Sequence, residues 1–122
     1  MSHIALLGCG LMGLPMGRRL LAAGHSLTAW NRTRAKAEAL LPDGASVADS
    51  PAEAVAQADI VIAMLQDGDA VHKVLFDSGD ASAVRGLRVG TLFIDMGSIL
   101  PEQAREHATR LGAAGVAALD AP

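Results

Sequence analysis

The sequence Ile4-Ala5-Leu6-Leu7-Gly8-Cys9-Gly10-Leu11-Met12-Gly13 joins a short apolar run to a glycine-rich turn, and a helical pattern follows. The glycines have the spacing G-x-G-x-x-G, with a predicted strand before them and a predicted helix after them. In that context the first glycine permits a tight turn, the second lets the backbone approach a pyrophosphate, and the third lets the helix pack closely on its strand. Free amides at the helix start then hold the phosphates. The motif predicts a dinucleotide site at Gly8, Gly10, Leu11, Met12 and Gly13.

The composition fits one domain built on a helix-covered sheet. Of the 122 residues 51% are hydrophobic, but there are only one Trp, two Phe and no Tyr. We therefore expect a core of Ala, Leu, Val, Ile and Met, as in a parallel sheet that is buried on both faces. The formal net charge of −3 gives no reason to expect nucleic acid or an acidic membrane surface as a partner.

Three features predict a cytoplasmic protein. No apolar run reaches the roughly 18 residues that are needed to span a bilayer. The N-terminus has no basic leader before an apolar segment, because residues 4–7 already form the first predicted strand. The single cysteine excludes an internal disulfide and is compatible with a reducing compartment.

Strand and helix signals alternate along the whole chain, with short connections and no internal repeat. Strands are predicted at residues 4–7, 26–30, 45–47, 59–65, 91–95 and 116–119. Helices are predicted after the glycine turn, over 33–41, from 51 onward, over 67–76 and over 101–111. The alternation predicts an α/β domain over residues 1–122, with a Rossmann-like, doubly wound, mainly parallel sheet and helices on both of its faces.

The end of the second predicted strand indicates which dinucleotide is preferred. Proteins that bind NAD usually place an acidic residue there, on the adenosine ribose hydroxyls. This chain instead has Asn31, followed by Arg32, Thr33 and Lys36. A carboxylate would repel a 2′-phosphate, whereas Arg and Lys attract it, so these four residues predict NADP, with NAD possible. The alternative is that Asn31 caps the next helix and both cations are simply solvated.

Two further segments follow predicted strands and should border the nicotinamide half of the same cofactor. In an open parallel sheet, ligands bind at the carboxyl ends of the strands. We therefore assign cofactor contacts to Met64 and Leu65 after the fourth strand and to Ser98 after the fifth. Ser98 is equally well placed to cap the next helix, and the two roles are compatible.

The remaining polar residues suggest structural roles. Cys9 occupies a variable position of the glycine loop, where a small filler is expected rather than a nucleophile. Asp67 and Asp69 flank a glycine like a helix-starting turn, so capping is favoured over an acid/base pair. Arg19 is a minor candidate for neutralising phosphate. The histidines have no ligand-like spacing, so no metal site is predicted, and each is expected at the surface or in a turn: His3, His25, His72 and His107.

Taken together, several motifs resemble the 3-hydroxyacid dehydrogenase superfamily, which includes 3-hydroxyisobutyrate dehydrogenase and tartronate semialdehyde reductase. The resemblance covers the whole chain, and the last two motifs together are specific. Imine reductases share the second motif, and 6-phosphogluconate dehydrogenases have an I-D-G-G-N-type sequence in place of the third. The motifs are Gly8 to Met16, Trp30-Asn31-Arg32-Thr33, Asp95-Met96-Gly97-Ser98-Ile99-Leu100-Pro101, and Leu119-Asp120-Ala121-Pro122.

This resemblance implies an NAD(P)-binding Rossmann-like domain followed by a helical substrate and catalytic domain, which is absent from this chain. It implies reversible hydride transfer between the nicotinamide and a small 3-hydroxy acid, and it allows a homo-oligomeric protein. The family's acid/base lysine lies on a later helix, so we expect no catalytic residue here and a nearly inactive domain. Gly97 departs from the serine or threonine common in this family. A stand-alone NADP-binding module and an imine reductase domain are the alternatives.

Overall fold

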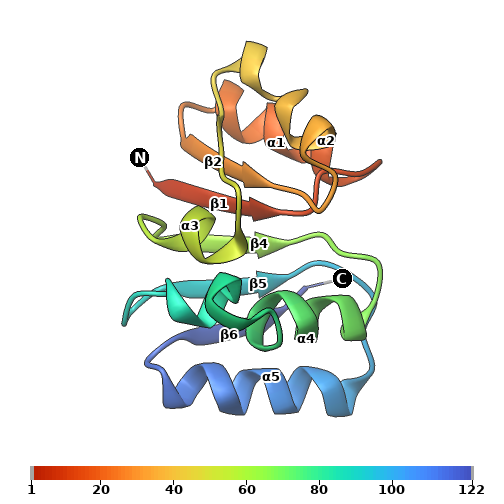
Figure 1. Ribbon diagram of the computed structural model, residues 1–122, viewed down its shortest axis with the longest axis vertical. Coiled ribbons are helices and arrows are strands. Elements are labelled where there is room, and N and C mark those ends of the chain that lie inside the picture. Colours follow the sequence, from red (N-terminus) through yellow and green to blue (C-terminus); the bar gives the residue numbers. More distant parts are fainter. Residues whose placement is uncertain (1, 122) are drawn as a thin grey trace.

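The computed structural model describes residues 2–121, which form one parallel sheet flanked by helices (Figure 1). The sheet has six strands in the order β3-β2-β1-β4-β5-β6, and every neighbouring pair is parallel. This order is that of the doubly wound dinucleotide-binding fold, so the predicted fold class is confirmed. The strands are β1 (His3–Leu7), β2 (Ser26–Trp30), β3 (Ser46–Val47), β4 (Ile60–Ala63), β5 (Leu92–Asp95) and β6 (Ala117–Asp120).

Two hydrophobic clusters cover the two faces of the sheet, because successive strand residues point to opposite sides. In β1, Leu6 joins one cluster together with residues of α1 and α2. Leu7 joins the other, which contains residues of α3, α4 and α5. Both side chains are fully buried, as expected for an all-parallel sheet. The helices are α1 (Gly13–Ala22), α2 (Arg34–Glu38), α3 (Pro51–Val55), α4 (Gly68–Phe76) and α5 (Pro101–Ala113).

Two connections differ from the sequence expectation. The predicted helix over 33–41 ends at Glu38, and a 3-10 turn over Leu41–Asp43 follows it. Pro42 explains the shortening, because proline disfavours helical geometry in the preceding residue and lacks an amide hydrogen. Residues 77–90, which had no assigned structure, form 3-10 turns at Gly79–Ala81 and Ala83–Arg85. Pro122, the last residue of the predicted Asp-Ala-Pro motif, lies outside the described residues.

The prediction that every histidine lies at the surface or in a turn is wrong for His107. This side chain is only 3% exposed and packs between α5 and α4, with its ring centroid 5.6 Å from that of His72 and 5.7 Å from that of Phe76. Burial lowers the pKa of His107, and the positive charges of His72 and Arg110 lower it further. The neutral ring therefore acts as an aromatic core residue between the two helices.

The helix cap at the start of α3 can be tested by mutation. Ser50 is the N-cap residue of α3, and its side chain accepts a hydrogen bond from the Glu53 backbone N–H at 3.1 Å. Ser50→Ala should lower the free energy of unfolding by about 1 kcal/mol, because that N–H loses its partner. Urea denaturation followed by circular dichroism measures this loss. The exposed Ser46→Ala in β3 is the matched control and should change stability by less than about 0.5 kcal/mol; equal effects would contradict the cap.

Candidate functional site

The three glycines of the opening motif have three different surroundings. Gly8 has a φ of +106°, and a Cβ there would collide with the backbone carbonyl of Met64. A Cβ on Gly13 would collide with the carbonyl of Gly8, so α1 packs against the end of β1 only because Gly13 has no side chain. Gly10 has no positive φ, and no atom of residues 2–121 lies within 4 Å of a Cβ built on it. The fold therefore requires Gly8 and Gly13, whereas Gly10 leaves open space in front of the backbone.

The loop around Gly10 presents unpaired hydrogen-bond donors. The Gly8 N–H donates to the Trp30 carbonyl at 2.9 Å, and the Cys9 N–H donates to Asn31 Oδ1 at 2.9 Å. Within residues 2–121, the next four backbone N–H groups donate no hydrogen bond. These groups stand at the positive end of the α1 dipole, where an anion is favoured. They belong to Gly10, Leu11, Met12 and Gly13.

One open cleft of about 850 Å³ runs from this loop along the carboxyl ends of the strands. All twelve residues that the sequence assigned to cofactor contacts line it, although their contacts with a cofactor remain a prediction. The cleft also has four wall residues that the sequence did not single out as contacts, from the segments after β4 and β5 and from α4. The predicted residues are Gly8, Gly10, Leu11, Met12, Gly13, Asn31, Arg32, Thr33, Lys36, Met64, Leu65 and Ser98, and the additional ones are Gln66, Ala70, Met96 and Gly97.

Asn31 is a brace within the cleft and does not cap α2. Its Oδ1 accepts from the Cys9 N–H, and its Nδ2 donates to the Thr33 carbonyl at 3.0 Å. Thr33 takes the N-cap position of α2, without a side-chain cap hydrogen bond. The capping alternative for Asn31 is therefore wrong. The Asn31 amide therefore connects the glycine loop to the turn after β2 and holds these two segments of the cleft together.

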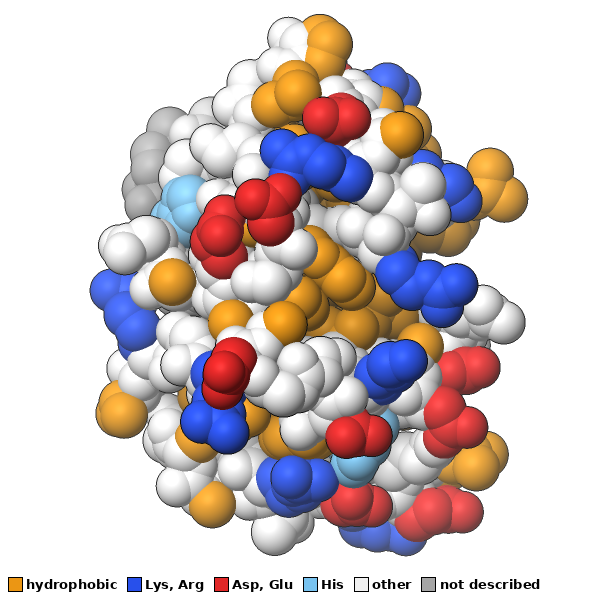
Figure 2. All heavy atoms as spheres, in the orientation of Figure 1, with side chains coloured by type: hydrophobic (Ala, Val, Ile, Leu, Met, Phe, Trp, Pro, Cys, Tyr) orange, Lys and Arg blue, Asp and Glu red, His pale blue; other side chains and the backbone are white. Residues whose placement is uncertain are grey.

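The cations near this turn differ in their partners. Arg34 forms ion pairs with Glu38 and Asp49. Arg32 and Lys36 are exposed, and neither forms an ion pair with any residue between 2 and 121. Figure 2 shows Lys and Arg side chains along the upper right edge of this face, whereas Asp and Glu side chains gather lower down, near α4 and α5. Two of the three cations close to the turn therefore remain available to an anionic ligand.

The structure also shows which residues cap α4 and α5, for which the sequence had suggested Asp67 and Ser98. Ser98 is exposed and lines the cleft but does not cap α5, because Leu100 takes the N-cap position. The Leu100 N–H donates instead to Gln103 Oε1 at 3.2 Å. Asp67 caps α4, since its Oδ1 accepts from the Ala70 N–H at 2.8 Å, so the preferred capping role is confirmed. Asp69 accepts from Gln103 Nε2 at 3.0 Å and thereby ties α4 to α5.

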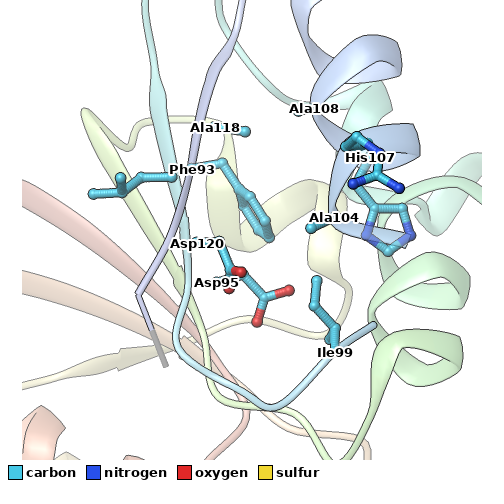
Figure 3. Close-up of a pocket in the computed structure, with 10 residues that line it drawn as sticks. Phe93, Asp95, Ile99, Ala104, His107, Ala108, Ala118 and Asp120 are labelled. Carbon is cyan, nitrogen blue, oxygen red and sulfur yellow. The ribbon is translucent and has the colours of Figure 1, made fainter. Parts of the chain in front are cut away.

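A second, smaller pocket of about 180 Å³ lies between α5 and the ends of β5 and β6 (Figure 3). Asp95 and Asp120 come from neighbouring strands and lie beside each other in this view, with the Phe93 ring and Ile99 close by. Asp95 is only 3% exposed. The sequence alone assigned no role to Asp95; its one signal is a carboxylate at the end of an apolar strand.

Cys9 is buried behind the glycine loop and is 2% exposed. Its Sγ lies 3.7 Å from the Trp30 carbonyl oxygen. Burial raises the pKa of the thiol to about 11, so the reactive thiolate is scarce at neutral pH. These facts agree with the filler role expected from the sequence. Within residues 2–121 no group of three or more His, Cys, Asp or Glu side chains could hold a metal ion.

The parallel sheet, the glycine turn with free amides and the cleft at the strand ends define a dinucleotide-binding α/β domain. The family model for the NAD binding domain of 6-phosphogluconate dehydrogenase matches residues 3–122. The chain therefore belongs to this family of NAD-binding domains, within the 3-hydroxyacid dehydrogenase superfamily that the motifs predicted. No helix in the described part of the chain has the length and apolarity to cross a membrane.

A curated relative and a solved structure agree with this assignment. The uncharacterized oxidoreductase YfjR of Bacillus subtilis is 41% identical over 98% of this chain and 41% of its own length. The structure of Mycobacterium tuberculosis 3-hydroxyisobutyrate dehydrogenase with L-serine has a TM-score of 0.90 and 37% identity, over 100% of this chain and 40% of its own. The chain thus spans about two fifths of the length of these relatives.

Imine reductases are structural neighbours as well. The enzyme from Myxococcus stipitatus in complex with NADP⁺ has a TM-score of 0.86 and 34% identity, over 97% of this chain and 39% of its own. Its V8 variant, solved in complex with NAD⁺, has a TM-score of 0.88 and 30% identity, over 98% and 40%. The solved neighbours therefore include an enzyme with NADP⁺ and a variant with NAD⁺, so they do not distinguish between the two dinucleotides for this chain.

Because the surroundings of Gly10 are open, a mutation there should affect dinucleotide binding without affecting the fold. Gly10→Val should leave the fold intact, because nothing lies within 4 Å of its Cβ, but should abolish binding of both NADPH and NADH. Fluorescence titration measures binding, and the thermal midpoint checks the fold. Gly112→Val is the matched control, since that position of α5 is equally open and does not line the cleft, and it should bind as the wild type does. Unchanged titration of a folded Gly10→Val protein would contradict the loop assignment.

The Cys9 thiol should resist alkylation in the folded protein. With a pKa of about 11, on the order of one thiol in a thousand is ionised at pH 8, and its sulfur is also shielded. We expect no iodoacetamide adduct by mass spectrometry under native conditions and complete modification in guanidinium chloride. The raised pKa also makes the stability of the fold depend on pH. Burial of the neutral thiol contributes to stability below pH 9.0, the ordinary pKa, and this contribution is lost as the pH rises through about 11. Rapid native modification would show that the loop opens.

Proposed function

We propose that the chain is the NADP(H)-binding domain of an oxidoreductase that transfers a hydride between nicotinamide and a small 3-hydroxy acid of the 3-hydroxyisobutyrate or tartronate semialdehyde type. One observation carries the proposal: four amides without an acceptor and two cations without an ion-pair partner, within residues 2–121, line the same cleft. The proposal includes a helical substrate and catalytic domain in the whole protein, since the relatives are more than twice as long.

The glycine loop fits a pyrophosphate. A phosphate group needs donors and room for its oxygens, and both meet in front of Gly10. A side chain at Gly10 would occupy this space, although the fold itself does not require a glycine there. We therefore assign phosphate binding to the N–H groups of Gly10, Leu11, Met12 and Gly13.

The turn after β2 fits a 2′-phosphate better than free ribose hydroxyls. A carboxylate in place of Asn31 would lie close to the added phosphate, and like charges about 4 Å apart cost on the order of 4 kcal/mol at an effective dielectric near 20. Asn31 is uncharged, and its amide is already engaged with the Cys9 N–H and the Thr33 carbonyl. We assign the 2′-phosphate to Arg32, Thr33 and Lys36, which gives a preference for NADP over NAD.

The segments after β4 and β5 form the wall for the nicotinamide half of the cofactor. When bound, the nicotinamide supplies or accepts the hydride. Met64 and Leu65 present apolar surface that orients the ring and excludes water, and Ser98 offers a hydroxyl from the neighbouring segment after β5. We assign no catalytic residue to this chain and place the acid/base group in the helical domain, as the family resemblance implies.

The imine reductase alternative has one specific observation in its favour, which is the 34% identity to the Myxococcus stipitatus enzyme with NADP⁺. Assaying the whole protein on cyclic imines and on 3-hydroxy acids separates the two activities. A domain that binds NADPH in a whole protein with neither activity would favour a binding module. Cytoplasmic location and homo-oligomerisation also belong to the proposal. The buried free thiol of Cys9 is compatible with a reducing compartment.

The cation assignment predicts a difference between the two dinucleotides. Arg32→Ala should weaken NADPH binding by roughly 1–3 kcal/mol, as expected when a charged group loses its partner, with little effect on NADH. Lys36→Ala should act in the same direction. Titrations of both cofactors measure the change.

Arg34→Ala is the matched control for this experiment. Arg34 starts the same helix, but it pairs with Glu38 and Asp49 and does not line the cleft. The Arg34 variant should therefore bind NADPH as the wild type does. Equal losses of NADPH and NADH affinity in the Arg32 variant would refute the 2′-phosphate role.

A further inference from the structure

The carboxyl group of Asp95 supports the wall of the cleft from behind. Asp95 is the last residue of β5, and its Oδ1 accepts a hydrogen bond from the Gly97 N–H at 3.0 Å. Gly97 is held tightly on the other side as well, because a Cβ there would lie 2.8 Å from the Leu65 carbonyl oxygen. Gly97 and Ser98 form part of the cleft wall. The Asp95 side chain thus sets where this segment stands relative to the segment that follows β4.

The second oxygen of the same carboxyl group is unsatisfied. Asp95 Oδ2 is buried and has no hydrogen-bond partner within residues 2–121, and no ion pair of that region includes Asp95. A buried carboxylate without a compensating donor or cation is costly. A proton on Oδ2 removes the charge and turns this oxygen into a donor.

The surroundings of Asp95 contain a second carboxylate. Asp120, the register partner of Asp95 on β6, lies beside it in Figure 3. On the α5 side of the same pocket stand Arg105 and His107. Burial raises the pKa of Asp95 above its ordinary 3.8, the Gly97 N–H lowers it, and the charge of Asp120 raises it again. Like charges opposite each other on neighbouring strands repel, so a proton on Asp95 relieves the repulsion.

We propose that Asp95 is a positioning residue of the dinucleotide cleft, which holds Gly97 and Ser98 in place, and that it does so best when its own carboxyl group carries a proton. The proposal rests on the proposed dinucleotide function. Loss of the proton from Asp95 leaves two adjacent anions at the ends of β5 and β6. Their repulsion moves Asp95 and, through its hydrogen bond, the Gly97–Ser98 wall.

Three substitutions separate this role from a general structural one. Asp95→Asn keeps an oxygen that can accept from the Gly97 N–H and carries no charge, like the protonated acid. Asp95→Ala removes the acceptor. Asp120→Asn leaves Asp95 intact but removes the repulsion. Asp80→Asn, at an exposed position of a 3-10 turn, is the matched control.

The readouts are NADPH and NADH titrations at several pH values and the amide signal of Gly97 in the cofactor-free protein. Asp95→Ala should weaken both dinucleotides about tenfold and accelerate hydrogen exchange at Gly97, because the N–H loses its acceptor. Asp95→Asn should bind within about twofold of the wild type and show less pH dependence, as should Asp120→Asn. Asp80→Asn should follow the wild type throughout.

The sign of the pH dependence follows from the raised pKa of Asp95. Protonation favours the folded arrangement, and this contribution is fully present below 3.8 and is lost as the pH rises through the higher folded value. The wild type should therefore approach Asp95→Asn in affinity and thermal midpoint as the pH falls from about 8 toward 4.

The possible failures are distinguishable. If the wild type binds neither dinucleotide, the proposed function fails and takes this proposal with it. If the wild type binds but Asp95→Ala binds equally well, only the positioning role is overturned. It is also overturned if Asp95→Asn loses as much affinity as Asp95→Ala at every pH. Should Asp95→Ala not fold, the pH profiles of the two Asn variants still decide the matter.

Discussion

The contact on which this molecule depends is the approach of backbone to backbone at the end of β1. Gly8 turns the chain against the carbonyl of Met64, and Gly13 brings the start of α1 against the carbonyl of Gly8. These contacts leave no room for a side chain at either glycine. They also direct the first amides of α1 toward the gap between β1 and β4, where the strand order reverses. A cleft with free donors is therefore a consequence of how tightly the first helix packs on the sheet.

The fold could be predicted because its signals are local and agree with one another. The run at residues 60–63 is apolar throughout, as a strand buried on both faces must be, and each turn contains Gly, Pro, Asp or Asn where the backbone requires it. The errors have local causes too. The helix after β2 was expected to run up to Pro42 but ends at Glu38, because the proline also disfavours helical geometry just before it. His107 is buried because α4 supplies an aromatic partner, and the sequence of α5 alone gives no sign of it.

The site divides into parts that a sequence can and cannot reveal. The residues of the cleft were predictable because parallel strands bring their carboxyl ends to one edge of the sheet. A residue that directly follows a strand in the sequence therefore lies at that edge, where the cleft is. Which atoms pair inside it was not predictable. The amide of Asn31 is engaged by Cys9 and Thr33, and Asp95 faces Asp120, because of sheet register and side-chain rotamers. Tertiary pairings of this kind are absent from any pattern within one segment.

The charges along the cleft follow from the same topology. Arg32 and Lys36 stand near the end of β2, whereas Asp95 and Asp120 end β5 and β6 at the opposite side of the strand order. Arg34 adds little to the positive end, because Glu38 and Asp49 neutralise it. A dinucleotide with its phosphates at the glycine loop and the turn after β2 therefore has its anionic part at the positive end. The opposite orientation would bring those phosphates toward the ends of β5 and β6, where the exposed Asp120 carboxylate would repel them. In the proposed function, electrostatics thus selects the same orientation as the free amides of the glycine loop.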